Sequence, residues 1–175
     1  MPGEPVDQLV DDTYAELRRL ASRYVRRDRN ASVQATDLVH EAYLRLSKTA
    51  NPVWKDRTHF VAIAAISMRR LLVERARARG ADKRGGGQVR VTLDDSLFVP
   101  ASPVQELDLV ALDRALERLG AVDAQQARIV ELRYFGGMSV PETAEAIGIS
   151  EATVKRHWTF ARAWLLRELE GAERA

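Results

Sequence analysis

The chain has 175 residues, enough for one medium-sized domain or two small ones. It contains no cysteine, which excludes a disulfide framework, a thiolate metal site and a cysteine nucleophile. Its net charge of +2 does not by itself indicate a polyanionic partner, but the charges are unevenly placed. No stretch approaches the roughly 20 apolar residues of a membrane span, and the acidic N-terminus lacks the apolar core of a secretion signal. We therefore expect a cytoplasmic protein with no membrane partner.

The N-terminal part of the chain predicts a helical bundle. Apolar residues recur at helical spacing over about 6–24, 35–48 and 58–79, and no run shows the alternation of a strand. Thr58 is the expected N-cap of the third helix. Together these helices predict one domain over residues 1–80.

The third predicted helix ends in a cluster of cations that only Glu74 and Asp82 interrupt. The cations are Arg69, Arg70, Arg75, Arg77, Arg79, Lys83 and Arg84. Such a cluster suits DNA phosphates, although a solvated basic helix end would look the same in sequence. For Glu74 and for Glu41, which also lies on an arginine-rich face, ion pairing with a neighbouring arginine is the simpler interpretation.

Aromatic and basic residues alternate just before and at the start of this helix. Trp54 and Phe60 are interleaved with Lys55, Arg57 and His59. Aromatic faces beside positive charge suit unstacked, single-stranded bases. Either aromatic side chain could instead close the core of the bundle, and for Phe60 we favour the core.

Residues 81–103 predict a flexible linker, since they hold three successive glycines and two prolines and show no helical period. Further helices are expected over about 104–119 and 124–135. The predicted fold class is therefore all-α, with two small helical domains, 1–80 and 104–175, joined by this linker.

A helix-turn-helix is predicted over residues 138–169. Gly148 stands where a helix-ending glycine belongs, and Ser150 is the expected N-cap of the next helix. The second helix has an apolar stripe consisting of Val154, Trp158, Ala161 and Leu165. Its predicted outward residues are Thr153, Lys155, Arg156, Thr159 and Arg162. These side chains can reach phosphates and base edges, so the pattern predicts binding of double-stranded DNA.

Nothing in the sequence assembles a catalytic or metal site. His40 and Glu41 open like a zinc-protease motif, but Leu44 occupies the position of the second histidine. The triple glycine lacks the Lys-Ser/Thr that completes a phosphate-binding loop. We therefore expect no enzymatic activity, no metal and no cofactor.

Nearly the whole chain resembles an extracytoplasmic-function sigma factor of the sigma-70 family. The resemblance lies in DLVHEAYLRL, HFVAIAAISMRRLLVERARAR, the linker, and ARIVELRYFGGMSVPETAEAIGISEATVKRHW, in that order. It implies that the chain binds bacterial RNA polymerase core and directs it to promoter DNA. It also leaves room for an anti-sigma factor or another regulator as a partner. Many members carry Asn where this chain has Arg70.

The resemblance assigns a role to each candidate residue. The first domain would correspond to sigma region 2, which docks on polymerase and reads and melts the −10 element, and the second to region 4, which reads the −35 element. The polymerase-docking residues would be Asp37, His40, Glu41 and Arg45. The −10 residues would be Trp54, Lys55, Arg57, His59, Arg69, Arg70 and Arg77. The −35 residues would be Ser150, Thr153, Lys155, Arg156, Thr159 and Arg162.

Two other classes of protein remain as alternatives. A stand-alone helix-turn-helix regulator would bind an operator without polymerase, but it gives no purpose to the docking helix or to the Trp54 loop. A nucleic-acid enzyme would need a carboxylate or histidine cluster, which the sequence does not offer.

Overall fold

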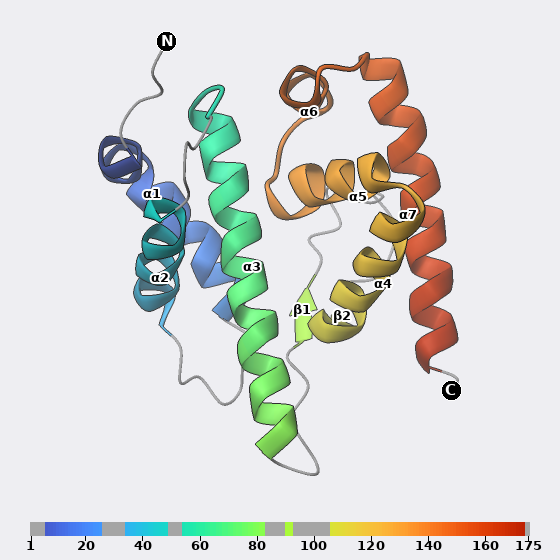
Figure 1. The fold of residues 1–175 in the computed structure, drawn as a ribbon, viewed down its shortest axis with the longest axis horizontal. Coiled ribbons are helices and arrows are strands. Elements are labelled where there is room, and N and C mark those ends of the chain that lie inside the picture. Colours follow the sequence, from blue (N-terminus) through green and yellow to red (C-terminus); the bar gives the residue numbers. More distant parts are fainter. Residues whose placement is uncertain (1–5, 26–33, 49–53, 83–89, 93–105, 174–175) are drawn as a thin grey trace.

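The computed structural model describes residues 6–25, 34–48, 54–82, 90–92 and 106–173, and it confirms the all-α class (Figure 1). The helices are α1 (Val6–Val25), α2 (Ala35–Ser47), α3 (Arg57–Asp82), α4 (Leu109–Val122), α5 (Ala124–Val130), α6 (Val140–Ile147) and α7 (Glu151–Glu173). A π-helical turn, η2 (Glu131–Phe135), continues α5. Two short strands, β1 (Arg90–Thr92) and β2 (Glu106–Asp108), pair antiparallel.

Helix α3 is the central element of the molecule. Its first half is apolar on all sides, and every side chain from Val61 to Met68 is buried except Ile63, which is half-buried. A helix that is apolar all round must be covered on all sides. Accordingly, α1 and α2 pack on one side of α3, and α4, η2 and α6 pack on the other (Figure 1).

The N-terminal half, residues 6–82, is held together where α1, α2 and α3 meet. Leu17, Leu38, Phe60 and Met68 are all buried there. The C-terminal half, residues 106–173, has its own apolar centre, with α7 packed against α4, α5 and α6. Burying side chains of this size contributes roughly 1.5–3 kcal/mol each, so both centres contribute substantially to stability.

The two halves share a closely packed boundary. A Cβ atom added at Gly136 would lie 2.6 Å from the Cβ atom of Ala62 on α3. The Tyr24 hydroxyl donates a hydrogen bond of 3.1 Å to the carbonyl oxygen of Phe135. The buried residues of both halves consequently form one continuous apolar cluster.

Several predicted boundaries are wrong for local reasons. Asp56, and not Thr58, caps α3, because its Oδ1 accepts a hydrogen bond of 2.7 Å from the His59 amide. Helix α4 begins at Leu109, later than predicted, because the residues before it form β2. The predicted helix end near Phe135 is confirmed, but its last turn is π-helical. Most of the predicted linker lies outside the described residues.

No helix in the described ranges has the length and apolar character needed to cross a membrane. The described residues also hold no cluster of three or more His, Asp or Glu side chains placed to bind a metal ion.

Candidate nucleic-acid interface

Local hydrogen bonds define the helix-turn-helix. The Ser139 Oγ accepts from the Glu142 amide at 3.3 Å, and the Glu142 carboxylate accepts from the Ser139 amide at 2.7 Å. This capping box fixes the start of α6. Gly148 ends α6 with a φ of +79°, a conformation that glycine adopts without steric strain. Ser150 then caps α7 by accepting from the Thr153 amide at 3.1 Å, as predicted.

The predicted apolar stripe of α7 is confirmed, since Val154, Trp158, Ala161 and Leu165 are all buried. The opposite face is open to solvent. Ser150, Lys155, Arg156 and Thr159 are exposed, and Thr153 and Arg162 are half-buried. The Lys155 Nζ lies 4.0 Å from a Glu151 carboxylate oxygen, which is a loose contact that a phosphate could replace.

Phe160 belongs to this open face but was not among the predicted site residues. Its side chain is 58% exposed, one turn after Arg156. An apolar side chain in this position can contact the methyl group of a thymine. The sequence already indicated that Phe160 is exposed, because Phe160 does not belong to the apolar stripe of Val154, Trp158, Ala161 and Leu165.

The segment from Trp54 to the start of α3 at Arg57, called the Trp54 segment, lies against the C-terminal half. Trp54 is half-buried, with its ring edge-on to the buried Phe60 ring at 5.2 Å between centroids, so the core assignment of Phe60 is confirmed. The Lys55 ammonium donates a hydrogen bond of 2.7 Å to the Glu145 carbonyl oxygen on α6. Arg57 is exposed and lies 3.7 Å from a Glu16 oxygen.

His59 sits beside this contact and is neutral near pH 7. Burial lowers the pKa of its imidazole, and the nearby positive charges of Arg128 and Lys55 lower it further, against the opposing effect of Asp56. The His59 Nδ1 accepts a hydrogen bond of 3.3 Å from the Lys55 amide, which fits an unprotonated nitrogen.

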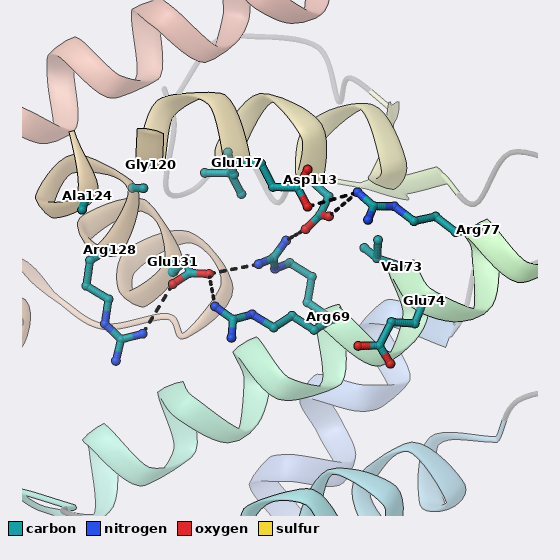
Figure 2. A pocket seen from close by; sticks show the side chains of 13 residues that line it. Arg69, Val73, Glu74, Arg77, Asp113, Glu117, Gly120, Ala124, Arg128 and Glu131 are labelled. Atoms are coloured by element: carbon teal, nitrogen blue, oxygen red, sulfur yellow. Dashed lines mark hydrogen bonds and ion pairs between the residues drawn. The ribbon is translucent and has the colours of Figure 1, made fainter. Parts of the chain in front are cut away.

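Three arginines on the second half of α3, Arg69, Arg70 and Arg77, are paired with carboxylates from the C-terminal half (Figure 2). Arg69 is buried and contacts both Asp113 of α4 and, at 3.0 Å, Glu131 of η2. Arg70 is exposed and also reaches Glu131, at 3.0 Å. Arg77 contacts Asp113 at 3.0 Å, and Glu117 at 3.2 Å. Three of the four predicted −10 arginines are therefore brought together, each in contact with a carboxylate, whereas Arg57 lies apart beside Glu16.

These carboxylates were not foreseen. Asp113, Glu117 and Glu131 surround a cavity of about 460 Å³ that the α3 arginines and Arg128 also line. Glu131 accepts from three of these guanidinium groups, including Arg128 at 3.4 Å. In the sequence, only the spacing of Asp113 and Glu117, one helical turn apart, indicates that two of these carboxylates share one face of a helix.

The candidate docking residues lie on α2. Arg45 makes a bidentate ion pair with Glu74 of α3, at 3.0 and 2.8 Å, and this hydrogen bonding lowers the pKa of Glu74. Glu41 pairs with Arg75, so the predicted ion pairing of both glutamates is confirmed. His40 is exposed, and Asp37 accepts from the Gln34 amide at 3.4 Å as part of the cap of α2.

A hollow of about 290 Å³ lies beside His40, between α1 and α2. Tyr14 and Tyr43 line it together with His40. Tyr14 is 40% exposed, which makes this face apolar enough to contact another protein.

The fold and these surfaces together define a helical DNA-binding protein with a helix-turn-helix near one end and a basic helix at its centre. The model of the ECF sigma factor family matches residues 3–171, and the chain belongs to that family. It is thus an RNA polymerase sigma factor, which binds polymerase core and promoter DNA and directs transcription initiation. The stand-alone regulator is not favoured.

A solved structure of the sigma factor RpoE in complex with the anti-sigma factor NepR from Bartonella quintana is similar to this chain. The two are 20% identical, with a TM-score of 0.40, over 94% of this chain and 96% of that one. A search of curated proteins found no match.

Proposed function

We propose that the two halves of the chain divide promoter recognition between them. The C-terminal half reads the −35 element as a duplex through α7, and the N-terminal half reads and opens the −10 element through the Trp54 segment and α3. The exposed face of α7, with Lys155 and Arg156 in its first turns, is the observation that carries this proposal. The N-terminus of α7, which is the positive end of the helix dipole, adds to the positive electrostatic potential that this face presents to DNA phosphates.

The remaining assignments follow from the same division. The exposed parts of α2, with Asp37, His40, Glu41 and Arg45, dock on polymerase. The sigma factor family is regulatory and not catalytic, so the protein supplies recognition while polymerase supplies the chemistry. We place its action with polymerase in the cytoplasm.

The test uses full-length protein assembled with polymerase core, on a promoter selected by the holoenzyme from randomised DNA. Arg156→Ala is expected to weaken binding by about 1–3 kcal/mol if it contacts a base edge, and to relax the preference at one −35 position. Lys155→Ala should weaken binding to all sequences alike and reduce the salt slope by about 1. Arg114→Ala, an exposed cation on α4, is the matched control.

Binding of each variant to polymerase core is measured in parallel by pull-down, because the α7 face lies apart from α2. Promoter affinity that stays at the wild-type value in both variants, with core binding intact, would contradict the assignment of α7 as the −35 reader.

A further inference from the structure

Phe160 lies at the centre of the outward face of α7, and its side chain is 58% exposed. Because an α-helix has about 3.6 residues per turn, Phe160 lies one turn after Arg156 and one turn before Ala163, and all three are exposed. The buried stripe from Val154 to Leu165 faces the opposite way. A single exposed apolar side chain is ordinary on a protein surface, so its neighbours decide what it can contact.

The neighbours of Phe160 form a basic surface. From position 152 to 163 the helix carries Lys155, Arg156 and Arg162, and it has no Asp or Glu. Lys155 and Arg162 are seven residues apart, so they lie on the same flank of the helix, beside the line through Arg156 and Phe160. A cation-flanked face of this kind matches a polyanion, which favours DNA over an apolar protein surface as the partner of Phe160.

The hydroxyl groups on this face already make hydrogen bonds within the protein. The Thr159 Oγ1 donates a hydrogen bond of 2.9 Å to a backbone carbonyl oxygen one turn earlier. The Ser150 and Thr153 hydroxyl oxygens lie 2.9 Å apart, and the Ser150 Oγ also caps α7. In the part of the chain that the structure describes, no carboxylate pairs with Arg156. The centre of the face therefore offers a guanidinium with donors to spare and, next to it, the Phe160 ring.

We propose that Phe160 is a specificity-determining residue of the −35 reader and contacts the C5-methyl group of a thymine near the guanine that Arg156 reads. This inference rests on the proposed function, because it takes α7 to lie in the major groove of the −35 element. In that groove arginine donates to the O6 and N7 atoms of guanine, and the thymine methyl group is open to apolar contact.

The helix geometry limits where this thymine lies. Two residues four positions apart are about 6 Å apart along a helix axis. Successive base pairs of B-DNA are about 3.4 Å apart. The thymine that Phe160 contacts should therefore lie one or two base pairs from the guanine that Arg156 contacts.

The same contact disfavours other bases. Adenine and cytosine present an exocyclic amino group in the major groove. Against the Phe160 ring such a group would lose its water without gaining a hydrogen-bond acceptor, which is unfavourable. Phe160 thus selects thymine both by attraction to the methyl group and by exclusion of polar groups.

The test removes one methyl group at a time. Deoxyuridine lacks only the C5-methyl group of thymidine and pairs with adenine in the same way. Full-length protein is assembled with polymerase core, and the −35 element is taken from DNA that this holoenzyme selects from a randomised pool. Each thymine of that element is replaced in turn by deoxyuridine, and affinity is measured by anisotropy of the fluorescein-labelled duplex.

We expect one deoxyuridine, within two base pairs of the guanine that Arg156→Ala ceases to distinguish, to weaken wild-type binding about three- to fourfold, as for one methyl group returned to water. Phe160→Ala should bind more weakly and no longer respond to that deoxyuridine. Phe160→Leu keeps an apolar side chain and should still respond. Val122→Ala, which shortens an apolar side chain that is 80% exposed at the end of α4, is the matched control and should behave as the wild type.

Four results would overturn the proposal. The selected −35 element has no thymine within two base pairs of that guanine, or wild-type binding is insensitive to every deoxyuridine; neither measurement depends on the folding of a variant. Phe160→Ala responds to the deoxyuridine as strongly as the wild type does. Phe160→Ala loses polymerase core in a pull-down while it keeps the deoxyuridine response, which would make Phe160 a contact for polymerase.

These results are separable from a failure of the proposed function. If Arg156→Ala and Phe160→Ala both leave promoter affinity at the wild-type value, α7 is not the −35 reader and the inference fails with it. If Arg156→Ala relaxes one −35 position but no deoxyuridine changes the affinity, the methyl contact fails and the assignment of α7 stands.

Discussion

Gly136→Ala should destabilise the folded chain by about 1–2 kcal/mol, and it tests how tightly the two halves are packed against each other. The backbone φ of Gly136 is −78°, so alanine fits the local conformation. Its Cβ atom, however, would lie 2.6 Å from the Ala62 Cβ atom and 2.5 Å from the Leu132 carbonyl oxygen. Both neighbours are held by packed backbone, so part of the strain would remain after relaxation.

The magnitude follows from two opposing effects. Overpacking of this kind costs about 1–3 kcal/mol. Replacing glycine also restricts the unfolded chain, which stabilises the native state by about 0.4–1 kcal/mol. Gly120→Ala is the matched control: its Cβ atom would lie 3.6 Å from the Ala127 Cβ atom, an ordinary contact, in the last turn of α4. We expect that control to stabilise the protein by about 0.4–1 kcal/mol, because alanine restricts the unfolded chain.

Urea unfolding of the full chain measures both variants. A double-mutant cycle with Ala62→Gly separates the contact between halves from the strain within η2, because only the first involves Ala62. A Gly136→Ala protein as stable as the wild type, or a coupling energy of zero with Ala62→Gly, would refute the inferred close packing of the two halves at this point.

Two smaller predictions concern a titrating group and a cap. The pKa of His59 is lowered in the folded state, so below about pH 6.5 the unfolded chain binds more protons than the folded chain. The contribution of His59 therefore makes the chain less stable as the pH falls through that range. His59→Gln should flatten this pH dependence of stability in urea titrations. Ser139→Ala should cost about 1 kcal/mol through the lost cap of α6, and an unchanged urea midpoint would contradict that role.

Local features of the C-terminal half could be predicted from the sequence because they depend on neighbouring residues. The left-handed turn at Gly148 and the cap at Ser150 each require a particular residue type at one position, and both are confirmed. The buried stripe of α7 follows from helical spacing alone. The cap at Asp56 was missed because Thr58, two residues later, is also a common capping residue, although aspartate ranks above threonine at this position.

The surroundings of the α3 arginines could not be predicted in the same way. A cluster of cations indicates that an anion is near, but its sequence does not say whether that anion is DNA or a carboxylate far along the chain. Arg69 pairs with Asp113, which lies 44 positions later, and with Glu131, which lies 62 positions later. The π-helical turn that places Glu131 packs against α3, and no residue type in η2 demands such a turn.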